Sequence, residues 1–163
     1  MAIHFPYWKV VEMNMTPEEA RKALGGVGET ERRLAERMHW PFSRHAMFGL
    51  AEALIVLAVG TPGGTGAAAA GAGIALALSL MYQDKQRYGM FVSGWHGDRT
   101  KPLMIVLIAA LLAFVAAAVL LRPAEGVEPL VVLVGGLTWI VCTALSMRWE
   151  KLYRLELREG ADR

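Results

Sequence analysis

Glu52 is the residue whose type and position most directly suggest chemistry. It lies near the middle of an apolar stretch, residues 45–60, that contains no other acidic or strongly basic side chain. An ionised carboxylate at the centre of a membrane span costs about 3 kcal/mol, so intramembrane acids are functional candidates by default. His45 and Gly49 precede Glu52 by seven and three residues and share its helix face. We therefore predict a candidate proton site in which His45 feeds a proton towards Glu52.

The same carboxyl has a structural alternative. A protonated or hydrogen-bonded Glu52 could lock helix packing, with Ser79, Thr138 or Thr143 as its partner. Residues 45–60 are also a short stretch preceded by Arg44, so Glu52 could take a tilted position nearer the membrane surface. Glu52 and His45 are thus predicted as a site for either proton transfer or packing.

Metal, thiol and hydrolytic chemistry find little support in the sequence. His96 and Asp98 lie close together, but the other histidines have no ligand-like spacing to them. Cys142 is the single cysteine, which excludes an internal disulfide and predicts a small packing residue. An intramembrane enzyme needs a nucleophile with a base, or paired acids, on facing helices. The apolar stretches hold only scattered Ser and Thr with one Glu, so we expect no enzyme, metal or cofactor.

Four apolar stretches must position these residues. Hydrophobic residues make up 55% of the chain, above the roughly half that soluble domains use, and the mean hydropathy is +0.35. Each stretch approaches the roughly 20 residues that a helix needs to cross a bilayer. The expected spans are residues 45–60, 65–82, 102–121 and 129–147. We predict an all-α integral membrane protein, a four-transmembrane-helix bundle formed by residues 41–147.

Basic residues predict the orientation, because Lys and Arg near span ends are retained in the cytoplasm. Seven precede the first span, four lie in the central loop and five follow the fourth span, whereas the other two loops share only Arg122. Most Trp and Tyr residues lie in or beside the same basic segments, as is typical of the membrane interface. Both termini are therefore predicted to be cytoplasmic. The net charge of +2, with both signs mixed, indicates no nucleic-acid partner.

The segments outside the spans are expected to be largely helical. Residues 1–15 lack the features of a signal peptide and could form an interfacial anchor or an unordered extension. Residues 16–40 predict a cytoplasmic amphipathic helix that begins at Thr16, the N-cap, and Pro17. Residues 148–163 predict a cytoplasmic extension of the fourth helix, since no Gly or Pro interrupts them before Gly160.

The helix at 16–40 carries apolar residues at spacings of three and four, as in a heptad seam. This candidate partner-binding seam consists of Leu24, Val27, Leu34 and Met38. It could fold back on the chain's own tail or the membrane surface, or it could recruit another protein.

Two further groups of residues are predicted to shape the membrane domain. Small residues let membrane helices approach closely, and the candidate packing residues are Gly66, Gly71, Gly73, Gly135 and Gly136. Aromatic and basic residues near the span ends are expected as interfacial or lipid-facing anchors: Trp40, Trp95, Arg99, Lys101 and Trp149. Membrane lipid is therefore an expected partner, with Arg99 and Lys101 near its phosphate.

Three segments carry a family resemblance: TPEEARKAL at 16–24, ERR at 31–33 and RYGMFVSGW at 87–95. Together with the order of the spans, they resemble a loose group of uncharacterised small bacterial four-span inner-membrane proteins with an N-terminal cytoplasmic helix. The resemblance covers most of the chain after Met15. It implies the bacterial inner (cytoplasmic) membrane, a multi-pass topology and no assigned activity.

The predicted function follows from what the spans lack as much as from what they contain. We expect a non-catalytic integral membrane interaction or accessory protein that belongs to a membrane complex or an oligomer. Its partners would be a membrane protein or further copies of the chain. The alternative is a small proton-coupled transporter that uses Glu52.

Overall fold

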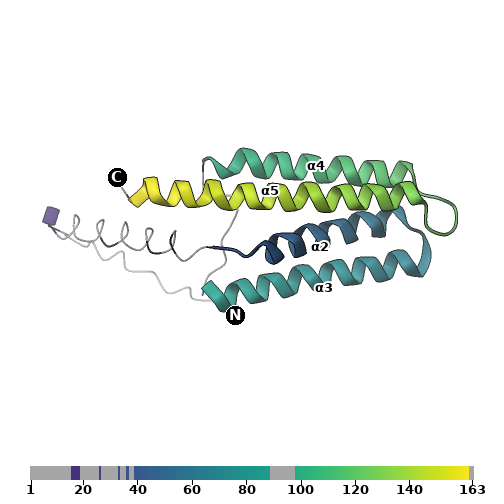
Figure 1. Ribbon diagram of the computed structural model, residues 1–163, viewed down its shortest axis with the longest axis horizontal. Coiled ribbons are helices and arrows are strands. Elements are labelled where there is room, and N and C mark those ends of the chain that lie inside the picture. Colours follow the sequence, from purple (N-terminus) through teal and green to yellow (C-terminus); the bar gives the residue numbers. More distant parts are fainter. Residues whose placement is uncertain are drawn as a thin grey trace, which may run out of the picture.

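Four long helices form the described part of the chain. A computed structural model describes residues 16–18, 26, 33, 36, 39–88 and 98–161. The helices are α2 (Phe42–Gly60), α3 (Gly63–Tyr88), α4 (Thr100–Leu120) and α5 (Pro129–Ala161), which run side by side along the long axis (Figure 1). Each is long and apolar enough to cross a membrane. The predictions of an all-α chain and of four such helices are confirmed.

Proline and glycine residues delimit the helices. Pro41 has an extended backbone immediately before α2, and Pro62 follows the end of that helix. Gly63 and Gly126 have φ angles of +72° and +79°, which are accessible to glycine, and allow the turns before α3 and α5. α5 is continuous to Ala161, so the predicted helical extension of the fourth span is present.

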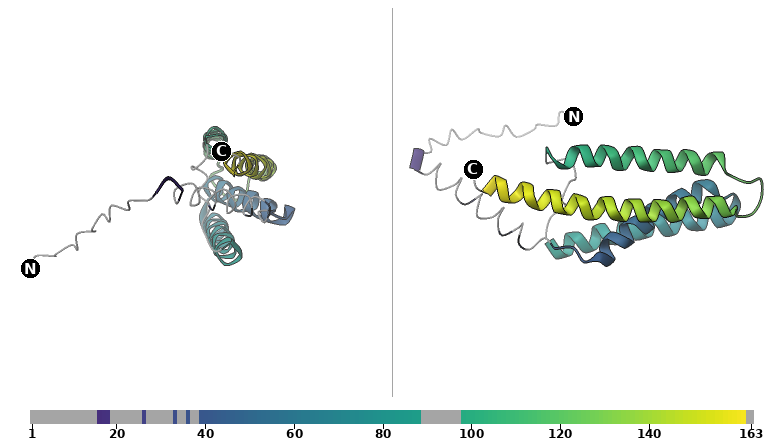
Figure 2. Two further views of the ribbon diagram at one scale, coloured as in Figure 1. Left: turned by 90° about the vertical axis from the view of Figure 1, so that its left-hand side faces the viewer. Right: turned by 45° about the horizontal axis from the view of Figure 1, so that its top comes forward.

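α2 is the central helix of the molecule. It packs against α3, α4 and α5, and α4 also packs against α5. Among the four described helices, α3 contacts α2 alone, so it lies on the far side of α2 from α4, as Figure 2 shows. α3 is therefore covered on one side only by the described helices.

Three of the five predicted packing glycines have close neighbours in the structure. A Cβ atom on Gly135 would lie 2.7 Å from Leu57 Cγ, and one on Gly73 would lie 3.0 Å from the Ala51 carbonyl oxygen. Gly66 faces the Thr61 carbonyl within the turn from α2 to α3. A larger residue at any of these three positions would collide with its neighbour.

The other two predicted packing glycines make no close contact with the described residues. Gly71 and Gly136 have no heavy atom of the described residues within 4 Å of a Cβ position, because both lie on outward helix faces. Gly49 instead provides the tightest crossing of α2 and α5, where a Cβ would lie 2.6 Å from the Trp139 carbonyl oxygen. A packing role for Gly71 and Gly136 therefore stays a prediction, and it would have to involve helices outside the described part of the chain.

Little of the predicted N-terminal helix is described. Thr16 is not helical and Pro17 is, which agrees with the predicted helix start, and Gly26, Arg33 and Glu36 are helical. The candidate seam residues Leu24, Val27, Leu34 and Met38 lie outside the described residues, as do Trp95 and residues 1–15.

Candidate functional site

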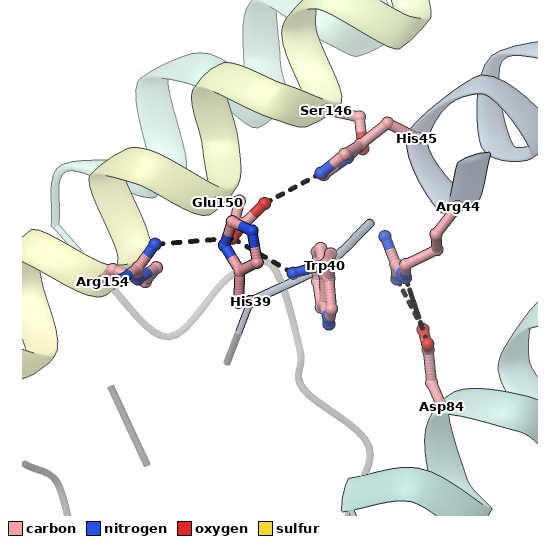
Figure 3. A network of polar contacts seen from close by, with 8 residues as sticks. All are labelled: His39, Trp40, Arg44, His45, Asp84, Ser146, Glu150 and Arg154. Carbon is pink, nitrogen blue, oxygen red and sulfur yellow. Dashed lines mark hydrogen bonds and ion pairs between the residues drawn. The ribbon is translucent and has the colours of Figure 1, made fainter. Parts of the chain in front are cut away.

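A buried polar cluster lies where α2 begins and passes α5. His45 is in the first turns of α2, while Ser146 and Glu150 are four residues apart on α5 and share one face. His45 Nδ1 lies 2.9 Å from Ser146 Oγ, and His45 Nε2 lies 2.8 Å from Glu150 Oε2 (Figure 3). His45 and Glu150 are only 2% and 6% exposed. Both imidazole nitrogens are therefore engaged inside the protein.

The chemistry of these contacts assigns the hydrogen bonds. An ionised carboxylate can only accept, so His45 Nε2–H donates to Glu150. In a neutral imidazole Nδ1 then accepts from the Ser146 hydroxyl, whereas a protonated ring would donate at both positions. The cluster can accommodate either protonation state of His45, because the Ser146 hydroxyl can rotate to accept or to donate.

Glu150 connects the cluster to the residues that lead into α2. Its Oε1 accepts a hydrogen bond from the backbone N–H of Trp40 at 3.3 Å and lies 3.7 Å from His39 Nδ1. The Arg154 guanidinium lies 3.8 Å from the same oxygen, one turn further along α5. One carboxylate thus joins α5 to α2 and to the segment before it.

A layer of aromatic rings covers this junction. Trp40 stacks on Trp149 at 5.5 Å between centroids, and Trp149 stacks on Tyr153 at 5.0 Å, with interplanar angles of 10° in both pairs. The Arg44 guanidinium lies 3.3 Å from the centroid of the Trp40 ring, a cation–π contact. These contacts hold the Trp40 side chain against α5.

The aromatic layer corrects one prediction from the sequence. Trp40 and Trp149 were predicted to be interfacial or lipid-facing, yet only 6% and 9% of their surfaces are exposed. Both rings are buried because they pack against each other and against Leu103 and Met104 of α4. They are core residues at this end of the helices and do not face outwards.

Arg44 links the cluster to α3. Its Nε lies 3.0 and 3.2 Å from the two carboxylate oxygens of Asp84, and a second guanidinium nitrogen contacts Asp84 Oδ2. This bidentate ion pair is among the stronger side-chain contacts available to a protein. It fixes the end of α3 to the beginning of α2.

Glu52 lies seven residues beyond His45 and is not part of this cluster. In the described part of the chain no hydrogen bond or ion pair reaches its carboxyl group. Thr138 and Thr143 donate instead to carbonyl oxygens of their own helix, at 2.8 and 2.7 Å, and Ser79 accepts from Gln83. The alternative partners named for Glu52 are thus satisfied within their own helices.

The structure brings His45 together with residues that were not predicted as a site. Ser146 and Glu150 lie 101 and 105 residues away in the sequence. The spacing of Cys142, Ser146 and Glu150, each four residues apart, places polar groups on one face of α5 and was the available signal. Residues 148–163 were predicted only as a cytoplasmic extension of the fourth helix, without a site on this face.

The basic residues at the start of α4 are paired with carboxylates. Arg99 contacts Glu159 at 2.8 Å and donates its backbone N–H to Glu156 at 3.2 Å. Lys101 contacts Asp98 at 2.9 Å, and the hydrogen bond and charge of its ammonium group lower the pKa of Asp98. Both basic side chains thus have acidic partners within the chain. Their proximity to lipid phosphate stays a prediction.

Ligands for a metal do not converge within the described residues, where no three His, Cys, Asp or Glu side chains are grouped. Comparison of the chain with models of known families, with curated proteins and with solved structures finds no match. The family resemblance therefore stays a prediction.

Proposed function

We propose that this protein is a non-catalytic component of a bacterial inner-membrane complex, in which α2 to α5 span the membrane and hold two cytoplasmic segments in a fixed relation. The segments are the residues before α2 and the extended end of α5. Glu150 is the observation that carries the proposal, because its carboxylate contacts the backbone of Trp40, the ring of His45 and its own helix. The charge pattern supports a cytoplasmic location for this end.

The polar atoms of His45 and Glu150 all have partners, which favours a role in holding the helices in place over a role in catalysis. Both nitrogens of His45 and both oxygens of Glu150 have partners, so the described geometry presents no unengaged base next to a nucleophile. A buried ion pair contributes little net stability, because desolvation offsets its attraction, but it can specify one arrangement of helices. We infer that the cluster fixes the direction in which the chain leaves the membrane towards residues 16–38.

The outward small residues support association with other membrane helices. Gly71 and Gly136 have open space where side chains would be, and α3 contacts α2 alone among the described helices. Without a hydrophobic force between helices in lipid, small residues promote association by allowing close contact. A membrane-protein partner or a second copy of the chain could use these faces.

Purification from native membranes in mild detergent tests this proposal. The wild-type chain should form a stable particle larger than one copy, measured by light scattering, with its composition given by mass spectrometry. Glu150→Gln should weaken that association while the chain stays inserted, because it alters the His45 contact without changing side-chain volume. The matched control is Glu159→Gln, an exposed acid on the same helix. A monomer, or equal behaviour of the two variants, would contradict the proposal.

A proton-coupled transporter remains the second candidate, favoured by one observation. Glu52 is half-buried within α2 and has no hydrogen bond to a described residue, so its carboxyl group is not held in a packing contact and is free to take up or release a proton. Proton flux into liposomes that contain the purified chain should then be lost in Glu52→Gln and retained in Glu125→Gln, an exposed acid between α4 and α5. Absence of flux in the wild type would dismiss this candidate.

A further inference from the structure

A cavity of about 180 Å³ lies between α2 and α3 at the end where the polar cluster is found. Its lining includes Ser43, Arg44 and Met47 from α2, and Leu80, Asp84 and Arg87 from α3. The cavity is lined by α2 and α3, whereas the His45 cluster joins α2 to α5. The proposed function uses none of this cavity.

The lining changes from polar to apolar along the helices. α2 begins at this end and α3 ends there, so Ser43 and Arg87 lie nearest the helix ends. Met47 and Leu80 lie one to two turns further into the apolar part of each helix. The cavity is thus amphiphilic, with its polar part where a membrane surface would be and its apolar part directed into the hydrocarbon.

The polar part carries an excess of positive charge. Arg44 is neutralised by Asp84, whereas Arg87 is exposed and makes no ion pair with any residue that the structure describes. The lining therefore has two cations and one anion, a net charge of +1. The N-terminus of α2 and the C-terminus of α3 meet at this end, so their opposite dipole charges largely cancel and the excess positive charge comes from Arg87.

Lipid has access to this cavity because α3 packs on α2 alone among the described helices. Two other basic residues at this end, Arg99 and Lys101, already contact Glu159 and Asp98. Arg87 is thus a better candidate than either for binding an external anion.

We propose that the cavity between α2 and α3 binds the phosphate headgroup of an anionic phospholipid. Arg87 and the Ser43 hydroxyl contact the phosphate, and Met47 and Leu80 contact the first part of an acyl chain. Arg44 and Asp84 hold the two walls together. The inference requires that α2 and α3 span a membrane, and it is independent of any protein partner.

Native mass spectrometry of the full-length protein in detergent tests the site, with phosphatidylglycerol as the probe and phosphatidylcholine as the neutral comparison. Wild-type protein should bind phosphatidylglycerol in preference to phosphatidylcholine. Arg87→Gln should weaken phosphatidylglycerol binding about fivefold, the effect of one cation at a membrane surface. The matched control is Lys85→Gln, which removes the same charge from the same helix outside the cavity. Ser43→Ala should weaken binding by a smaller factor than Arg87→Gln.

Three results would overturn the inference. Equal binding of the two lipids by the wild type would show that the headgroup is not recognised. Equal losses in Arg87→Gln and Lys85→Gln would indicate general attraction to a basic surface. Full displacement of phosphatidylglycerol by millimolar inorganic phosphate would indicate a site for the free anion, without a contribution from Met47 and Leu80 to an acyl chain. Thermal unfolding of each variant in detergent verifies that the fold is retained.

Discussion

The two main contacts of α2 differ in how they use polar groups. Towards α5, α2 presents Gly49 and the buried ring of His45, both of whose nitrogens contact side chains of α5. Towards α3, it presents Arg44, whose ion pair with Asp84 is partly exposed beside an open cavity. The first contact can fix a geometry, and the second leaves room for a ligand. The same helix therefore combines a rigid side with an accessible one.

Removal of Glu150 should have the largest effect on stability. Glu150→Ala leaves His45 buried without its partner, and breaking a buried pair in this way costs about 3–5 kcal/mol. Reversible unfolding in mixed detergent and SDS micelles, followed by circular dichroism, measures the loss. The double variant His45→Leu with Glu150→Leu should recover most of it, because apolar residues of similar size remove the desolvation cost. A double variant as unstable as Glu150→Ala would mean that the pair itself supplies the stability.

Gly49→Val should be the next most destabilising change. A Cβ atom at this position would lie 2.6 Å from the Trp139 carbonyl oxygen, so α2 and α5 would have to separate. We expect the unfolding free energy to fall by about 3 kcal/mol, the upper end of the usual range for overpacking. Gly136→Val, on an outward face of α5, should change the unfolding free energy by less than about 1 kcal/mol in detergent. Similar losses in the two variants would contradict the close crossing of α2 and α5.

Asp84→Ala should have a smaller and more local effect. The variant removes a bidentate contact of Arg44, but the guanidinium can remain over the Trp40 ring and reach water. We expect a loss of about 1.5 kcal/mol, the lower end of the range for a hydrogen bond to a charged group, because the pair is partly exposed. Pulsed hydrogen exchange should show faster exchange at the end of α3 than in α5. Uniform acceleration across all four helices would show that the pair acts on the whole fold.

Glu159→Gln should have the smallest effect. The ion pair with Arg99 is about half exposed on both sides, and such surface pairs contribute less than about 1 kcal/mol. Its unfolding free energy should match that of the wild type at high salt, where screening removes the attraction. A large, salt-independent loss would place this pair in the same class as His45 and Glu150.

Much of the candidate site was outside the reach of the sequence patterns. His45 was identified because it precedes Glu52 by seven residues on one helix face, a relation that a single segment contains. Its contacts with Ser146 and Glu150 depend on how two helices far apart in the chain are rotated about their axes. Trp40 and Trp149 illustrate the same point, since their type indicated an interface and only their stacking buries them.

The sequence by itself determined the helical class, the number of long apolar helices and the approximate limits of each. Those properties depend on the length and composition of one segment at a time, and on prolines and glycines at its ends. Tertiary structure alone decided that α3 packs on α2 only, that Gly49 forms the close crossing, and that His45 meets Glu150. The physical reason is that apolar residues suit both lipid and helix contacts, so their pattern does not reveal which face of a membrane helix is buried.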